Sequence, residues 1–310
     1  MILIRYCGGL GNQMFQYAFQ TAIQEKYKGI SVKADLSHYI LNHEHNGFEL
    51  EKYFQIRLQE AERKEIKKYS PYYMPSAEVL MMPKAIRNFI TERYQYRYAE
   101  QKKKKNPESF YRQEYHSSFE PKVFDLDRNK DWYLDGLWQN LRYLDGCEEK
   151  VRKAFTFHNE ELYTAQDREW KEQIEKGDSV GIHIRRGDFV NSKFDICSEE
   201  YFRKALKILN EQREKLTLFF FSDDPDFVEE QFADLSNKVL IRHSAENSIL
   251  DMEMLSLCKH KILSNSTFAF WAGWIGKKEK EIVIAPKYSL IKQDQQYELQ
   301  GMSNWRYLEP

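Results

Sequence analysis

From residue 179 onward the sequence alternates short apolar runs with longer helical segments, and this alternation constrains the fold more than any other feature. Apolar runs typical of strands lie at 179–184, 217–222, 239–241, 261–264 and 281–285, and helical segments lie between them at 199–211, 226–232, 248–258 and 268–276. Strands that are joined through helices pair in parallel. The pattern therefore predicts a doubly wound α/β sheet, which binds ligands at the carboxyl ends of its strands.

The beginning of the chain has a similar unit. An apolar strand at 1–6 leads through a glycine-rich turn into a helix predicted over 13–27, and a short strand follows at 30–35. Strand, helix and strand at this spacing indicate a second parallel sheet. We therefore expect two Rossmann-like domains that face a cleft, an N-terminal domain over 1–155 and a C-terminal domain over 156–310.

The segment from about residue 60 to residue 106 is strongly charged and has a helical pattern. It ends in four consecutive lysines at 102–105. We interpret this lysine run as a solvated loop or helix end, and the alternative is a contact with lipid headgroups or a polyanionic substrate. Neither interpretation gives the run a catalytic role.

The composition excludes several classes of protein. Apolar residues make up 42% and charged residues 31%, as in folded globular chains. The formal charge of −1 argues against a nucleic-acid binder, which would carry a basic field. No apolar run reaches the length of about 18 residues that a membrane-spanning helix needs. Because the first strand begins at Met1 and the four cysteines are widely spaced, we expect a cytoplasmic, bacterial-type chain with reduced thiols and no leader.

The sharpest local feature is an apolar strand that ends abruptly in charge, at His183, Arg185, Arg186 and Asp188. Guanidinium groups at the carboxyl end of a parallel strand present planar pairs of donors that suit phosphate oxygens. The alternative is that the arginines pair with Asp188 or Asp223 and only fasten the edge of the sheet. Adjacent residues on an extended chain point in opposite directions, so one arginine can contact a ligand while the other holds the scaffold.

A second feature follows the strand at 261–264, where Ser266, Thr267 and Phe268 precede an aromatic-rich helix. The amino end of a helix offers free N–H groups and the positive end of the helix dipole, so it can bind a phosphate without a metal. The alternative is an ordinary helix cap with no ligand.

The glycine-rich turn after the first strand contains Gly9, Gly11, Asn12 and Gln13. Its glycines let the backbone approach a ligand closely, but it matches neither a Walker motif nor a complete dinucleotide fingerprint. We expect the three features together to hold a diphosphate between the two domains. No Asp-x-Asp pair stands at a strand end in the first half, and Asp223 with Asp224 fits a helix cap, so we predict no metal site and no cofactor.

These features form a set that resembles the α-1,2-fucosyltransferase family, the inverting enzymes of glycosyltransferase family 11. Residues 8–18 resemble its amino-terminal signature, 183–188 its His-x-Arg-Arg-x-Asp motif, 221–224 a short block, and 264–268 with Trp271 and Trp274 its third block. The blocks run in the family's order over nearly the whole chain. One departure is Ala269-Phe270-Trp271, where the family usually has Ser-Trp-Trp.

The resemblance implies a GT-B-like architecture, GDP-β-L-fucose as donor, inversion to an α-1,2 linkage on a galactosyl glycan acceptor, and no required metal. Similarity to the wider fucosyltransferase group places Arg185 on the diphosphate and His183 and Asp251 on the guanosine. For Asp251 the alternative is a charge favoured by the helix dipole, and for His183 a satisfied buried imidazole. A lipid-linked glycan and a free oligosaccharide are equally compatible acceptors, and a lipid-linked acceptor would bring the protein into peripheral contact with the membrane.

The expected mechanism is attack of the acceptor 2-hydroxyl on the anomeric carbon as GDP departs. Arg185 and the helix end at Ser266 and Thr267 would stabilise the negative charge on the leaving diphosphate. Asp188 and Asp195 are candidate general bases. Acceptor-binding residues are expected on loops around 35–48 and 189–197, and the alternatives are a transferase for another GDP-sugar or a carbohydrate-binding protein without catalysis.

Overall fold

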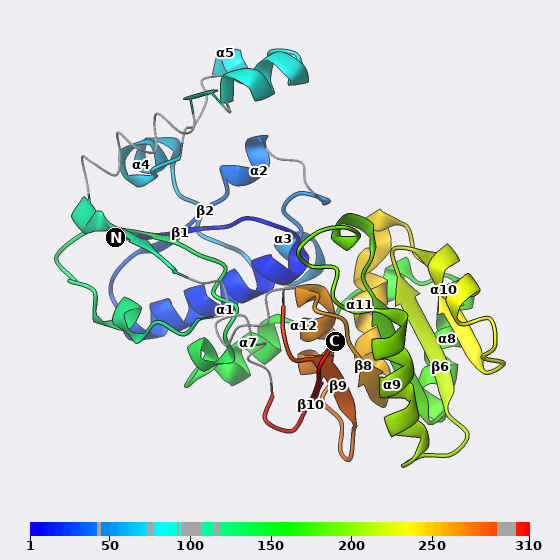
Figure 1. The fold of residues 1–310 in the computed structure, drawn as a ribbon. Helices are drawn as coiled ribbons and strands as arrows, with labels where there is room; N and C mark the ends of the chain where they lie inside the picture. Colours follow the sequence, from blue (N-terminus) through cyan, green and yellow to red (C-terminus); the bar gives the residue numbers. More distant parts are fainter. Residues whose placement is uncertain (42–44, 73–76, 92, 95–106, 115–117, 290–301) are drawn as a thin grey trace. The chain divides into compact units, whose positions relative to one another are not determined.

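The computed structural model describes residues 1–310 except 42–44, 73–76, 92, 95–106, 115–117 and 290–301 (Figure 1). The chain divides into two compact units, the first made of Met1–Glu51 with Ile56–Val151 and the second of Lys52–Gln55 with Arg152–Pro310. The division falls inside helix α7 (Glu148–Ala154), slightly before the predicted boundary at 155/156. The lysine run at 102–105 lies outside the described residues.

The first unit holds a four-stranded parallel sheet in the order β2-β1-β4-β3. Its strands are β1 (Ile2–Arg5), β2 (Val32–Asp35), β3 (Phe110–Arg112) and β4 (Trp132–Asp135). The helix predicted after β1 is present as α1 (Leu10–Lys26), but it begins before residue 13. Gly8 has φ of +78° and turns the chain, and Gly9 occupies the extended cap position, so Gly11 and Asn12 already lie in the first helical turn.

Short helices complete this part of the chain. They are α2 (His38–Leu41), α3 (Leu50–Tyr53), α4 (Arg63–Tyr69), α5 (Ala77–Leu80), η1 (Pro107–Ser109), η2 (Pro121–Asp125) and η3 (Leu141–Leu144). The helical pattern predicted from residue 60 is thus confirmed in part, at α4, α5 and residues 84–91. Strand β3 was not predicted, because a run as short as Phe110–Arg112 has no clear alternation of apolar and polar residues.

The second unit holds a six-stranded parallel sheet in the order β10-β9-β8-β5-β6-β7. Its strands are β5 (Ser179–Ile184), β6 (Thr217–Ser222), β7 (Lys238–Ile241), β8 (His260–Ile262), β9 (Val283–Pro286) and β10 (Arg306–Leu308). Its helices are η4 (Glu160–Leu162), α8 (Ala165–Lys176), η5 (Gly187–Phe189), α9 (Glu199–Asn210), α10 (Pro225–Gln231), η6 (Ala245–Asn247), α11 (Ser248–Leu257) and α12 (Thr267–Ile275). This is the strand order of a dinucleotide-binding sheet, whose direction of winding reverses between β5 and β8.

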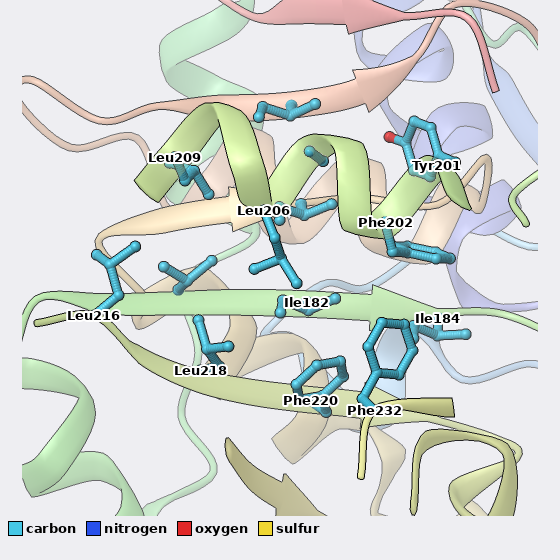
Figure 2. Close-up of a cluster of buried hydrophobic side chains, with 14 of the residues drawn as sticks. Ile182, Ile184, Tyr201, Phe202, Leu206, Leu209, Leu216, Leu218, Phe220 and Phe232 are labelled. Carbon is cyan, nitrogen blue, oxygen red and sulfur yellow. The ribbon is translucent and has the colours of Figure 1, made fainter. Parts of the chain in front are cut away.

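The core of this unit explains why its helices lie on both faces of the sheet. Alternate residues of β5, namely Val180, Ile182 and Ile184, pack with α9 in one buried cluster that also contains residues of β6 and α10 (Figure 2). The intervening Gly181 faces the opposite side, where an added Cβ would lie 2.6 Å from Leu255 of α11. Helix α11 in turn contacts α8 and α12. The predicted doubly wound sheet is confirmed.

Two further findings concern the cysteines and the possibility of a membrane-spanning helix. All four cysteines are free thiols. Within the described residues, no helix is long and apolar enough to cross a membrane. The predicted pair of α/β domains is confirmed, while their arrangement around a cleft stays a prediction.

Candidate functional site

The second unit brings its predicted residues together at the point where the winding of the sheet reverses. The chain leaves β5 towards α9 on one face and leaves β8 towards α12 on the other. In open α/β sheets this divergence forms the crevice in which ligands bind. His183 at the end of β5 and Ser264 just beyond β8 lie here, with 2.9 Å between Nδ1 of the imidazole and Oγ of the serine.

His183 is a buried and neutral histidine. Burial, together with the nearby charge of Arg185, lowers the pKa of His183 to about 3. Its ring lies 5.8 Å from the ring of Phe268, at the start of α12. A neutral imidazole donates at one nitrogen and accepts at the other. Nδ1 of His183 contacts Ser264, so Nε2 is the atom that can form a hydrogen bond with a ligand.

Arg185 is held between two carboxylates. Its Nη1 lies 2.8 Å from Oδ2 of Asp223, and its Nη2 lies 2.6 Å from Oδ1 of Asp188. Asp188 is the more exposed partner, with 55% of its side chain accessible against 26% for Asp223. Exposed ion pairs contribute little free energy, so an incoming phosphate can replace Asp188 while Asp223 keeps the guanidinium in place.

Arg186 is also paired. Its Nε lies 3.0 Å from Oδ2 of Asp224, its guanidinium lies 3.9 Å from the ring centre of Phe227, and its backbone N–H donates to Asp223. The ion-pair alternative, pairing with Asp188 or Asp223, therefore describes Arg185. Arg186 is also ion-paired, but its partner is Asp224. A ligand contact of Arg185 or Arg186 stays a prediction, with Arg186 the more firmly tied to the scaffold.

Gly187 makes room for this arrangement. A Cβ added at this position would lie 2.6 Å from Oδ2 of Asp223, the oxygen that forms the ion pair with Nη1 of Arg185. The glycine of the motif thus lets the carboxylate approach the strand end closely enough to hold both arginines.

The amino end of α12 faces the same edge. Ser266 has the extended backbone of a cap residue, but among the described residues no side-chain hydrogen bond caps this helix, so the structure does not show the ordinary helix cap that was the alternative. Ser266, Thr267 and Phe268 are partly exposed. The buried Asn265 fixes the preceding turn, because its Nδ2 donates to the carbonyls of Phe194 and Ser289, both at 3.0 Å. Within the part of the chain that the structure describes, the N–H groups of the first turn are therefore available for an anion.

The glycine-rich turn belongs to the first unit, and its side chains mostly support the fold. The amide of the fully buried Gln13 makes four hydrogen bonds, from Nε2 to the carbonyls of Gly8 and Gly47 and to Oε1 from the N–H groups of Glu49 and Leu50. These four hydrogen bonds use the whole capacity of the amide, so the side chain of Gln13 has no group left to bind the donor substrate in this conformation.

Asn12 and Gly11, in the same turn, also have structural contacts. Oδ1 of Asn12 accepts from Gln139 at 2.7 Å, and Gly11 is buried in the helix. The participation of Gly9, Gly11 and Asn12 in donor binding stays a prediction.

Asp251 lies in the first turn of α11, as both of its interpretations require. The structure adds a partner that the sequence analysis missed, His243, which follows the end of β7. Its Nδ1 lies 2.6 Å from Oδ1 of Asp251, and its Nε2 lies 2.9 Å from Oδ1 of Asp167 on α8. His243 could have been found from the sequence, because it stands just beyond the carboxyl end of a strand. Asp167 could not, because it is far from His243 and Asp251 in the sequence and only the fold brings the three together.

The second candidate base, Asp195, is exposed and accepts from the backbone N–H of Asn191 at 3.0 Å. It therefore stabilises its own loop. Among the described residues, no group of three or more histidine, cysteine or acidic side chains is arranged to hold a metal ion.

A solved structure supports the assignment of the architecture. The NodZ α-1,6-fucosyltransferase that was co-crystallised with GDP aligns over 88% of this chain and 92% of its own, with a TM-score of 0.50 and 14% identity. At this identity the likeness concerns the fold alone. Two parallel α/β sheets and this likeness define a glycosyltransferase fold of the GT-B type.

The family follows from sequence. The model of glycosyl transferase family 11 matches residues 1–309, so the chain belongs to that family. An α-1,2-colitosyltransferase from Escherichia coli is 29% identical over 92% of this chain and 91% of its own length. A galactoside 2-α-L-fucosyltransferase from Caenorhabditis elegans is 26% identical over 56% of this chain and 53% of its own length. The predicted family is confirmed.

Proposed function

We propose that this protein transfers L-fucose from GDP-β-L-fucose to the 2-hydroxyl of a galactosyl acceptor with inversion. The observation that carries the proposal is the convergence of His183, Arg185 and the uncapped end of α12 at one reversal point, in a chain of glycosyl transferase family 11. Such a site offers a cation and free N–H groups to a diphosphate and a neutral imidazole beside them.

In the proposed reaction the acceptor oxygen attacks the anomeric carbon while the bond to the diphosphate breaks on the opposite face. Negative charge grows on the leaving diphosphate, where Arg185 and the first turn of α12 stabilise it. Asp223 orients the guanidinium, and Asp188 gives way to the phosphate. Asp188 then becomes free to accept the acceptor proton, which keeps it as the candidate base.

We propose that this reaction needs no metal ion. The acidic pair Asp223 and Asp224 stands at the end of β6, where it would be the natural place for a cation, but each carboxylate is paired with an arginine instead. The positive charge that a diphosphate requires is supplied by side chains and by the helix end.

A transferase for a different GDP-sugar is the second candidate. The 29% identical relative is a colitosyltransferase, which forms the same α-1,2 linkage with another sugar. Nothing in the phosphate-binding arrangement distinguishes sugar rings. Parallel assays with GDP-fucose, GDP-colitose and GDP-mannose separate the candidates, since the proposed enzyme turns over GDP-fucose fastest.

The test of the proposal is release of GDP from GDP-fucose, with EDTA present, over a panel of galactosides. We expect galactoside-dependent turnover in the wild type and a loss of about 10²- to 10³-fold in Arg185→Ala, as for other groups that stabilise a developing charge. Arg203→Ala is a matched control, because Arg203 also pairs with two carboxylates, Glu199 and Asp234, but lies on α9. Equal losses in both variants, or turnover abolished by EDTA, would contradict the proposal.

A further inference from the structure

His243 connects two helices of the second unit through two carboxylates. Its Nδ1 lies 2.6 Å from Asp251 on α11 and its Nε2 lies 2.9 Å from Asp167 on α8, and only 8% of its side chain is exposed. The ring of Trp170 packs against it in a T-shaped arrangement, with 6.0 Å between ring centres. An imidazole that faces a carboxylate at each nitrogen satisfies both only when both nitrogens carry protons, so the bridge requires the imidazolium.

The bridge is anchored at its α8 end. Oδ2 of Asp167 accepts from the backbone N–H of Thr164 at 2.7 Å and from its hydroxyl at 2.8 Å, in the capping box that begins α8. Oδ1 of Asp167 is left for His243. The position of the imidazolium is therefore fixed by the start of a helix, and the imidazolium in turn fixes Oδ1 of Asp251.

The other end of the bridge is open to a ligand. Asp251 keeps 22% of its side chain exposed, and within the described part of the chain its Oδ1 alone is hydrogen-bonded. A carboxylate held in one orientation accepts from two neighbouring donors, such as N1–H and the exocyclic amine of guanine. Adenine presents an acceptor at N1, which such a carboxylate repels.

We propose that His243 is a positioning residue for selection of the nucleotide base, and that its bridge to Asp167 orients the Asp251 carboxylate towards guanine. This inference rests on the proposed function, in which Asp251 contacts the guanosine of the donor. His243 itself does not touch the nucleotide.

The bridge depends on pH. The titratable groups that face His243 are Asp251 on α11 and Asp167 on α8, while the neighbouring Arg242 is 3.9 Å from Glu229 on α10. Burial lowers the pKa of His243, but the hydrogen bonds and charges of Asp251 and Asp167 outweigh it and raise that pKa above its ordinary value of 6.5. The bridge is complete below the ordinary histidine value as long as both carboxylates are ionised, and it is lost as pH rises through the raised pKa of His243. Burial also raises the pKa of Asp251, so the bridge is lost again at acid pH, where that carboxylate is protonated.

The test measures the dissociation constants of GDP and ADP below and above this pKa for the wild type, His243→Gln and Asp167→Asn. The two nucleotides carry the same diphosphate, so the ratio of their constants cancels the titration of the phosphate. We expect the wild type to prefer GDP at low pH and to lose that preference as pH rises. His243→Gln should lose about tenfold of the preference at low pH, in line with a hydrogen bond to a charged group, with ADP binding unchanged.

Asp167→Asn provides the readout that a purely structural role would not move. Its amide oxygen still caps α8, but one negative charge beside His243 is gone, so the midpoint of the pH dependence should shift to lower pH. A wild type that binds GDP no better than ADP overturns both this inference and the proposed donor. A GDP preference and pH dependence that persist in His243→Gln overturn the positioning role alone.

Discussion

At the scale of single residues, the charged side chains at the end of β5 and of β6 hold one another in place through ion pairs. Arg185 and Arg186 share Asp223, which forms an ion pair with the guanidinium of the first and accepts a hydrogen bond from the backbone N–H of the second. The sequence analysis could predict this charged cluster because all its members stand at strand ends. The saturation of Gln13 by the backbone was not predictable, because Gly47 and Glu49 lie in an irregular loop and Leu50 begins the short helix α3 that follows it.

Gly187→Ala tests whether the packing around Asp223 matters for function. The new Cβ would push Asp223 away from Arg185, so we expect turnover to fall by roughly tenfold to a hundredfold through misplacement of the guanidinium. The free energy of unfolding should fall by only about 1–3 kcal/mol, as for local overpacking. Turnover kinetics together with urea unfolding measure both effects, and unchanged turnover would show that Asp223 does not position Arg185.

At the scale of elements, the long apolar strands and their helices were predictable, and the short edge strands were not. Strand β10 spans Arg306–Leu308, and its apolar and polar residues show no repeat, so only its pairing with β9 defines it. The packing of helices against one another was also not predictable from the spacing of apolar residues. A Cβ at Gly276 would lie 2.0 Å from the carbonyl oxygen of Ser256, so the close approach of α11 and α12 depends on a glycine with no local signature.

Lys261 on β8 should be important for the stability of α12. Its Nζ donates to the carbonyl of Gly276 at the end of α12 and lies 3.3 Å from Glu281, and the lysine and glutamate side chains are 0% and 2% exposed. Removing the cation leaves a buried carboxylate unpaired, so Lys261→Met should lower the free energy of unfolding by about 3–5 kcal/mol. Urea unfolding measures this loss, and Lys261→Met combined with Glu281→Gln should recover part of it. A loss in the double variant as large as in the single one would refute the pairing argument.

At the scale of the whole molecule, the order of strands and helices determines where chemistry is placed. The sequence analysis predicted two parallel α/β domains, because alternation of strand and helix leaves few topologies. The identity of the sugar and of the acceptor does not follow from topology, since we expect the acceptor-binding residues on loops. The bridge of Asp167, His243 and Asp251 joins segments that lie apart in the chain, so it was identified from the folded structure and not from the sequence.

In the proposed function, GDP binds at the reversal point between β5 and β8. Hydrogen exchange of the backbone amides, measured with and without GDP, tests it directly. We predict that GDP slows exchange at 185–188 and in the first turn of α12, at 267–269, and leaves the far end of α9 unchanged. If saturating GDP slows exchange elsewhere but leaves both of these segments unprotected, GDP does not bind at this reversal point.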